Sequence, residues 1–169
     1  MDSAFNLRPA RTSDVAAIKR LVARLADERI LISKETVAYY ESLQEFQIAE
    51  SAEGEVIGCG ALHVMWEDLA EIRTLAAADS WRGKGVGHKL VESLIDKARE
   101  LGVSRVFCLT FEVDFFVRHG FEVMADQSAV DPEVYSELLR SHDEGVAEFL
   151  DLARVKPNTL GNTRMIKHL

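Results

Sequence analysis

The sequence predicts a mixed α/β or α+β fold built around a central sheet. Two observations predict it. Residues 86–101 carry apolar side chains at helical spacing, and this segment stands between β-like runs over residues 70–77 and 105–111. Further short β-like runs come before and after this strand–helix–strand unit. Strands in this order argue for a mixed sheet.

The elements of the first half follow from apolar spacing and from turn residues. Thr12 and Ser13 are residue types that cap helix N-termini, and apolar residues recur at helical spacing after them. Gly54 lies in a turn between two β-like runs, which predicts a hairpin. The predicted elements are a strand over residues 6–8, a helix to about residue 26, a short helix near residues 35–43, and hairpin strands over residues 46–50 and 55–63.

The second half is predicted around the strand–helix–strand unit. Gly102 is a residue type that ends helices, and it follows the long amphipathic segment directly. After the strand over residues 105–111, the predicted elements are a short helix ending at residues 119–121, a strand over 121–124, a helix over 132–140 and a last strand over 163–168. Residues 141–162 carry no pattern that predicts an element.

Length and composition limit the class of protein. The chain has 169 residues, of which 47% are hydrophobic, so a single domain over residues 1–169 with a sizeable core is expected. The apolar runs fall short of the roughly 20 residues that a membrane span needs. The first residues lack the layout of a signal peptide, so a cytoplasmic location is expected. A formal net charge of −8 argues against nucleic-acid binding, which needs clustered cations.

Cys59 and Cys108 each stand inside an apolar, strand-like run. Free cysteine is among the most buried residue types, so both are predicted to be reduced thiols in the core. Neither has a neighbouring histidine or a CxxC partner, and the five histidines show no metal-ligand spacing. The sequence therefore predicts no metal site.

A glycine-rich, basic loop joins the strand over residues 70–77 to the long helix. It reads Arg82-Gly83-Lys84-Gly85-Val86-Gly87. Glycine lets backbone N–H groups approach an anion, and a helix N-terminus offers unpaired N–H groups with partial positive charge. Arg82, Lys84 and Lys89 place three cations here in an acidic chain. The segment predicts a phosphate-binding loop; a tight turn with glycines for packing alone is the structural alternative.

Other sequence motifs for phosphate binding or nucleophilic catalysis do not fit. A P-loop requires GxxxxGK followed by Ser or Thr, which is absent, and a dinucleotide fingerprint requires a third glycine where His88 stands. The GxSxG motif of a nucleophilic serine is absent as well.

The basic loop resembles the R/Q-x-x-G-x-G/A pyrophosphate loop of the GNAT acetyltransferase superfamily. Residues 7–10 with Asp14 resemble the opening strand and helix of that superfamily, residues 56–62 its third strand, and residues 116–121 its helix ending in Gly-Phe. As a set, these similarities extend over about residues 7–124 and are highly specific.

Within the superfamily, the chain is most similar to short, free-standing N-acetylglutamate synthases. The similar stretches are residues 30–32, 45–46, 59–62, Glu71, 75–77, 107–110 and 116–121. The chain departs from the longer synthases around Ser33 and Lys34, where paired basic residues are usual, and in an extra segment after Ser141.

The GNAT resemblance implies a mixed sheet of about six to seven strands flanked by about four helices, with a V-shaped splay between two parallel strands. Acetyl-CoA, the implied cosubstrate, would lie where the strands over residues 70–77 and 105–111 separate, and transfer would be direct within a ternary complex. No metal is implied. The implied cofactor-binding residues are Leu75, Ala76, Ala77, Arg82, Gly83, Lys84, Gly85, Val86, Gly87 and Phe116.

The resemblance also supplies a candidate base. Glu71 matches the acidic residue at this strand position in the synthases, and an α-ammonium group must lose a proton before it attacks. The alternative for Glu71 is a solvated strand-end carboxylate, and Glu112 is the reserve candidate. Many relatives place a proton-donating tyrosine at the position of Phe116, which has no proton to give, so the general acid is not identified.

The predicted reaction moves acetyl from acetyl-CoA to the α-amino group of L-glutamate or L-glutamine, the first step of arginine biosynthesis. The substrate-binding candidates are Lys34, Arg73, Glu112 and Arg164, with Arg118 as a further cation; surface charge is the alternative for each. The resemblance raises two further expectations, a homodimer and feedback by arginine. The alternative functions are acetylation of another amine (a protein N-terminus, a lysine or an antibiotic) and non-catalytic acetyl-CoA binding by a regulator.

Overall fold

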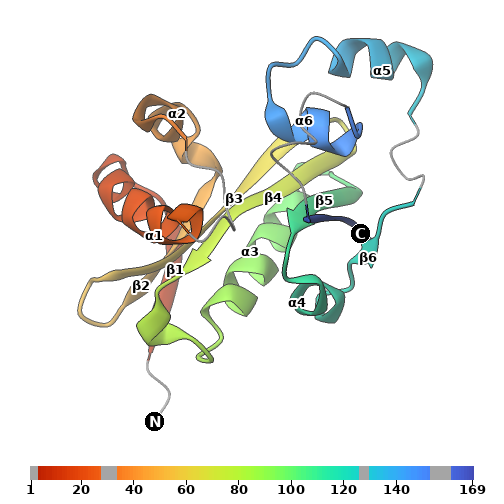
Figure 1. The fold of residues 1–169 in the computed structure, drawn as a ribbon. Helices are drawn as coiled ribbons and strands as arrows, with labels where there is room; N and C mark the ends of the chain where they lie inside the picture. The colour runs from red at the N-terminus through yellow and green to blue at the C-terminus, as the bar shows by residue number, and fades with distance from the viewer. Residues whose placement is uncertain (1–3, 28–33, 126–129, 153–160) are drawn as a thin grey trace. The chain divides into compact units, whose positions relative to one another are not determined.

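A computed structural model describes residues 4–27, 34–125, 130–152 and 161–169 of the chain. Seven strands hydrogen-bond in the order β1-β2-β3-β4-β5-β7-β6 (Figure 1). The pair β4–β5 is parallel, whereas β1–β2, β2–β3, β5–β7 and β6–β7 are antiparallel. The predicted mixed sheet is therefore confirmed. The chain divides into two compact units, residues 1–63 with 72–100 and residues 64–71 with 101–169, and the expected single domain stays a prediction.

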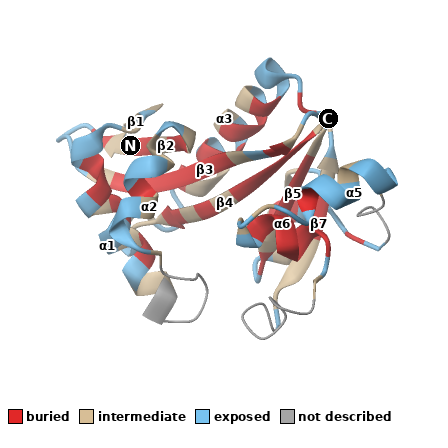
Figure 2. Cartoon of the chain, turned by 90° about the horizontal axis from the view of Figure 1, so that it is seen from above, coloured by how far each residue is buried: buried red, intermediate tan, exposed pale blue. Residues whose placement is uncertain are grey.

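Most of the first unit's elements lie where the apolar spacing predicts them. They are β1 (Phe5–Pro9), α1 (Val15–Asp27), α2 (Thr36–Glu41), β2 (Phe46–Ser51), β3 (Val56–Trp66), β4 (Leu69–Ala77) and α3 (Val86–Leu101), with 3-10 turns at Thr12–Asp14, Leu43–Glu45 and Asp79–Trp81. The ends of β3 and β4 that adjoin their connecting turn belong to the second unit. Strands β3 and β4 are buried over most of their length (Figure 2).

Two apolar clusters cover the two faces of the strands in the first unit. Helices α1 and α2 pack on one face, where Ile18 and Tyr39 meet Ile48 and Cys59 (Figure 1). Helix α3 packs on the other face, where Val86 and Leu90 meet Ala49 and Ile57. Such two-sided burial explains why these strands are rich in small and β-branched apolar residues.

The second unit has its own core and contains one helix that the sequence does not predict. Its elements are β5 (Arg105–Thr110), α4 (Val113–Arg118), β6 (Glu122–Val123), α5 (Pro132–Leu138), α6 (Glu144–Phe149) and β7 (Thr163–His168). The described residues thus form six α-helices instead of about four. Helix α6 is only six residues long and buried almost all round, so it has no amphipathic period; its sequence signal is Asp143, whose side chain accepts from the N–H of Val146 at 3.1 Å.

An aromatic contact organises the core of this unit. The rings of Phe107 on β5 and Phe149 on α6 meet edge to face, with centroids 5.6 Å apart. The guanidinium of Arg105 lies 5.8 Å from the centroid of Phe149 and donates to Asp68 at 3.0 Å. Cys108 is buried on β5 and Cys59 on β3, as predicted for core thiols. Among the described residues, no helix has the length and apolar character to cross a membrane.

Helix α3 approaches β3 very closely. A Cβ built on Gly58 would lie 2.6 Å from Cγ1 of Val86 and 3.1 Å from Cδ1 of Leu90, and one on Gly60 would lie 3.0 Å from Cδ1 of Leu94. These glycines therefore set the distance between the strand and the first turns of the helix.

We expect Gly58→Ala to lower the free energy of unfolding by about 1–3 kcal/mol, because the added methyl group overpacks the contact with Val86. Gly60→Ala is the graded comparison and should cost less, since its nearest contact is at 3.0 Å and involves the end of a leucine. Urea denaturation measures both. Equal stability of Gly58→Ala and wild type would show that the close approach is not a constraint.

A buried carboxylate fixes the start of α1. Asp14 is 5% exposed and accepts from Arg8 through both oxygens, at 2.7 and 2.9 Å, and from the N–H of Arg11 at 2.6 Å. The hydrogen bond from Arg8 outweighs burial and holds the pKa of Asp14 below its usual value. Arg8 also donates to Glu50 on β2 at 2.8 Å, so one guanidinium ties β1, β2 and the first turn together.

We expect Asp14→Asn to lower the free energy of unfolding near neutral pH by about 1–3 kcal/mol, because Arg8 loses a charged, partly buried acceptor. The folded pKa of Asp14 lies below its unfolded value, so this stabilisation is present above about pH 4 and is lost as the pH falls through the folded pKa. Denaturation of wild type and variant at neutral and acidic pH should show that the difference between their free energies of unfolding becomes smaller in acid. Glu50→Gln, at a side chain that is 30% exposed, should cost less.

Candidate functional site

The basic loop begins where β4 ends. The N–H of Ala78 donates to the carbonyl of Ile57 on β3 at 2.8 Å, and a 3-10 turn over Asp79–Trp81 follows. Gly83 and Gly85 then adopt φ of +78° and +82°, in the left-handed region that side chains disfavour. Nothing lies within 4 Å of the position that a Cβ would occupy at either glycine. The loop is therefore open on its outer side, with room for a ligand against the backbone.

The first turn of α3 supplies the donors. The N–H of Lys89 donates to the carbonyl of Gly85 at 3.0 Å and starts the helical ladder. The N–H groups of Val86, Gly87 and His88 precede that ladder, and a helix of 16 residues adds partial positive charge at this end. Main-chain donors beside open glycines form the geometry that binds a phosphate group.

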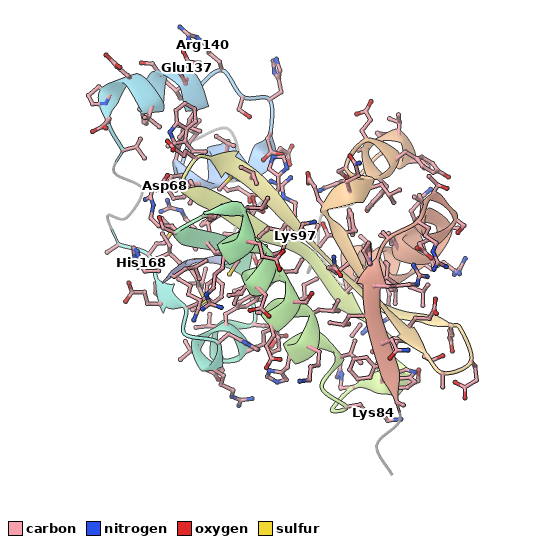
Figure 3. All side chains as sticks on the ribbon, turned by 180° about the vertical axis from the view of Figure 1, so that it is seen from behind. Asp68, Lys84, Lys97, Glu137, Arg140 and His168 are labelled. Atoms are coloured by element: carbon pink, nitrogen blue, oxygen red, sulfur yellow. The ribbon has the colours of Figure 1, made fainter. Side chains whose placement is uncertain are left out.

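Side chains hold the loop and surround it with positive charge. Trp81 packs edge to face on Phe5 of β1, with centroids 6.1 Å apart, and Nζ of Lys84 lies 4.8 Å from the Trp81 ring. Figure 3 shows Lys84 in the loop before α3. Arg24 of α1 pairs with Asp79 at 2.5 Å, whereas the Arg82 side chain is 81% exposed and 3.7 Å from Asp79. The loop is thus anchored by Trp81 and Asp79, neither of which the sequence motif singles out.

A cavity of about 540 Å³ borders the start of the loop, on the side of α1. Its charged lining residues are Arg20, Arg24, Asp14, Glu55 and Asp79. Because acids balance the two arginines, this cavity lacks the positive potential that a diphosphate requires, and the loop's N–H groups are the better anion site.

Strand β4 contains a backbone irregularity directly before the predicted pantetheine-binding residues. Thr74 has φ of +56°, which is a genuine outlier for a β-branched residue. Leu75 and Ala77 pack toward α3, whereas Ala76 belongs to the cluster under α1. No sequence signal could have found this feature, because threonine does not favour positive φ.

The candidate base lies in the second unit. Glu71 is 5% exposed. It lies opposite Phe107 in the parallel β4–β5 ladder, which spans three residue pairs. Burial raises the pKa of the Cys108 thiol, and the negative charge of Glu71 raises it further. Because Glu71 is buried, the alternative of a solvated strand-end carboxylate is wrong for this residue. Glu112 is exposed at the start of α4, where its N–H donates to Oγ1 of Thr110 at 2.8 Å.

Phe116 is 5% exposed and packs edge to face on Phe115 and Phe121, each with centroids 5.1 Å away. It is a core residue of α4 as well as a candidate contact for the cofactor.

The candidate substrate-binding cations occupy different surroundings. In the second unit, Nε of Arg164 donates to the carbonyl of Glu148 at 2.9 Å, and its Nη2 donates to the carbonyl of Phe149, so this side chain caps the C-terminus of α6. Burial lowers the pKa of Arg164, and Asp151 partly offsets this. Arg118 is exposed at the end of α4. In the first unit, Lys34 stands half-buried before α2 and Arg73 half-buried on β4.

The described residues include no group of three or more His, Cys, Asp or Glu side chains that could hold a metal ion. The open glycine loop before α3 is the candidate anion site of the first unit. A model of the acetyltransferase (GNAT) family matches residues 17–121, which include this loop, Glu71 and Phe116. The chain belongs to the acetyltransferase (GNAT) family. The resemblance that the sequence motifs indicate is therefore confirmed, and so is the GNAT fold.

Sequence and structure matches from Mycobacterium tuberculosis cover nearly the whole length of this GNAT chain. An amino-acid acetyltransferase of Mycobacterium tuberculosis is 54% identical over 162 residues, which are 95% of this chain and 92% of that protein. A crystal structure of a Mycobacterium tuberculosis protein in complex with CoA and a second ligand has a TM-score of 0.92 at 53% identity, covering 97% of this chain and 99% of the other.

A longer protein contains the same fold as one part of its chain. An N-acetylglutamate synthase from Neisseria gonorrhoeae, complexed with coenzyme A and N-acetyl-glutamate, has a TM-score of 0.77 at 23% identity. The match covers 100% of this chain but 36% of that one, so the likeness shows the shared fold of one part of the longer enzyme.

Proposed function

We propose that this GNAT chain transfers the acetyl group of acetyl-CoA to the α-amino group of L-glutamate or L-glutamine, the first step of arginine biosynthesis. The observation that carries the proposal is the open glycine loop at the N-terminus of α3. Support comes from the amino-acid acetyltransferase at 54% identity and from the solved relatives that hold CoA.

The loop fits the diphosphate of CoA. The N–H groups of Gly83, Gly85, Val86 and Gly87 would donate to phosphate oxygens, and Arg82 would add charge. The N–H of Lys84, which donates to the carbonyl of Trp81 at 3.2 Å, would have to leave that partner to join them. The Arg82 side chain is 81% exposed, and its contact with Asp79 is long at 3.7 Å. The side chain is therefore able to turn toward a bound anion. Backbone groups of Leu75, Ala76 and Ala77 would hold the pantetheine arm and orient the thioester carbonyl, and Phe116 would contact the cofactor.

Glu71 is the proposed general base. It would take a proton from the substrate ammonium, directly or through water, and the free amine would attack the thioester carbon. A C–N bond forms, the C–S bond breaks and its electron pair leaves on sulfur, and the positively charged nitrogen of the adduct loses a second proton to water to give the neutral amide. Phe116 cannot protonate that sulfur, but an alkyl thiol with a pKa of about 8.5 is a tolerable leaving group as its thiolate.

The substrate carboxylates would be bound by cations. Lys34 and Arg73 are the proposed partners, while Arg164 already donates to two carbonyls at the end of α6. Glu112 would bind the substrate ammonium or serve as the reserve base. The homodimer, the arginine feedback and the cytoplasmic location stay predictions from the sequence.

The reaction is tested by incubating the protein with acetyl-CoA and a panel of amines and following release of the CoA thiol. Glutamate or glutamine should give the highest kcat/KM, with acetylated product identified by mass spectrometry. Turnover only with a protein N-terminus, a lysine peptide or an antibiotic would move the proposal to another acceptor. CoA binding without thiol release from any amine would favour the regulator.

We expect Gly85→Ala to weaken CoA binding about tenfold, because alanine is strained at φ of +82° and its methyl group would stand where the phosphate lies. Titration calorimetry with CoA measures this. Gly54→Ala is a matched control, since Gly54 has φ of +84° and equally open space but lies in the β2–β3 turn. It should lose similar stability and keep CoA affinity; equal weakening in both variants would contradict the loop assignment.

We expect Glu71→Gln to lower kcat about 100-fold while CoA affinity is unchanged, since the amide keeps the shape but cannot accept the proton. Thiol release and calorimetry measure the two quantities. Glu67→Gln, an exposed carboxylate in the same β3–β4 hairpin, is the control and should behave as wild type. Full activity of Glu71→Gln would remove the base assignment.

A further inference from the structure

The left-handed conformation of Thr74 needs an explanation in its surroundings. Two non-glycine residues have positive φ among the described residues, Thr74 and Asp151. Aspartate tolerates this conformation, but a β-branched threonine in the middle of a strand is strained. Such strain persists only where neighbouring groups hold the backbone in place.

The thiol of Cys59 contacts this strained backbone directly. Sγ of Cys59 donates to the carbonyl oxygen of Thr74 at 3.5 Å, and the backbone N–H of Ala76 donates to the same sulfur. One buried atom on β3 thus contacts the peptide groups on both sides of Leu75. Cys59 has no exposed surface and Thr74 is 8% exposed, so water does not compete for these contacts.

The sulfur keeps its proton under physiological conditions. Burial raises the pKa of Cys59 to about 12, and the hydrogen bond from Ala76 offsets this only in part. The side chain is therefore a thiol, which can donate to Thr74, and not a thiolate, which cannot.

The direction of one N–H group follows from this contact. The described peptide bonds are all trans, so the C=O of Thr74 and the N–H of Leu75 point in opposite directions. A carbonyl held at Cys59 turns the Leu75 N–H away from that sulfur. Leu75 is the first of the residues proposed to bind the pantetheine arm and the thioester.

We propose that Cys59 is a positioning residue for acetyl transfer: its thiol holds Thr74 in the left-handed conformation and so aims the Leu75 N–H at the thioester carbonyl. This role rests on the proposed function. Cys59 touches no substrate, so it acts only through the backbone of β4. The diphosphate loop is separate from this contact and should bind CoA independently of it.

The first test compares kinetics with binding. Cys59→Ala should lower kcat about tenfold, because the buried carbonyl loses its donor, and should leave the Kd for CoA within about twofold. Cys59→Ser restores a donor and should recover most of the activity. Val22→Ala is the matched control: Val22 is 2% exposed in the same cluster as Cys59, and its truncation should lower Tm but not kcat.

The second test relieves the strain directly. Glycine accepts positive φ without cost. In a Thr74→Gly background, Cys59→Ala should therefore lower kcat by less than half of the factor by which it lowers kcat when Thr74 is present. A crystal structure of Cys59→Ala should show the φ of Thr74 outside the left-handed region.

The outcomes separate this role from the proposed function. If wild type releases thiol but Cys59→Ala loses no more kcat than Val22→Ala, or if Thr74 keeps its positive φ in Cys59→Ala, the role of Cys59 is overturned alone. If wild type releases no thiol with any amine, the proposed function fails and the role falls with it.

Discussion

The close packing of α3 on β3 is the constraint on which the candidate site depends. Gly58 and Gly60 carry no side chain toward the helix, so the first turns of α3 rest on the strand at a distance that a Cβ would prevent. This contact fixes the place of the helix N-terminus. The N–H groups of that first turn are the proposed anion donors, so a packing contact inside the core sets the geometry of the candidate surface site.

Backbone groups dominate the proposed chemistry of the first unit. The cations of the loop lie on the surface: the Arg82 side chain is 81% exposed, and Nζ of Lys84 lies 4.8 Å from the centroid of the Trp81 ring. Side chains of this kind strengthen anion binding but do not define its geometry. What defines the geometry of anion binding is the main-chain conformation at Gly83 and Gly85.

Several charged and aromatic residues of the second unit make structural contacts that a sequence motif does not reveal. Arg164 caps α6 through two carbonyl contacts, and Phe116 lies between Phe115 and Phe121. Glu71 is a buried carboxylate, which water does not readily solvate. A buried carboxylate in a family site is a stronger candidate for proton transfer than an exposed one such as Glu112.

Sequence alone determined the strand–helix–strand unit and the glycine-rich basic loop between β4 and α3, because both depend on local properties: apolar period, turn glycines and closely spaced cations. That this loop binds phosphate stays a prediction. The sequence also placed β7 over residues 163–168. It did not predict helix α6, because a helix that is buried on nearly all sides lacks the helical alternation of apolar and polar residues. Tertiary structure alone decided the left-handed Thr74, its contact with Cys59 and the capping role of Arg164. Each of these joins residues that are distant along the chain, and no local pattern encodes which carbonyl a thiol or a guanidinium will meet.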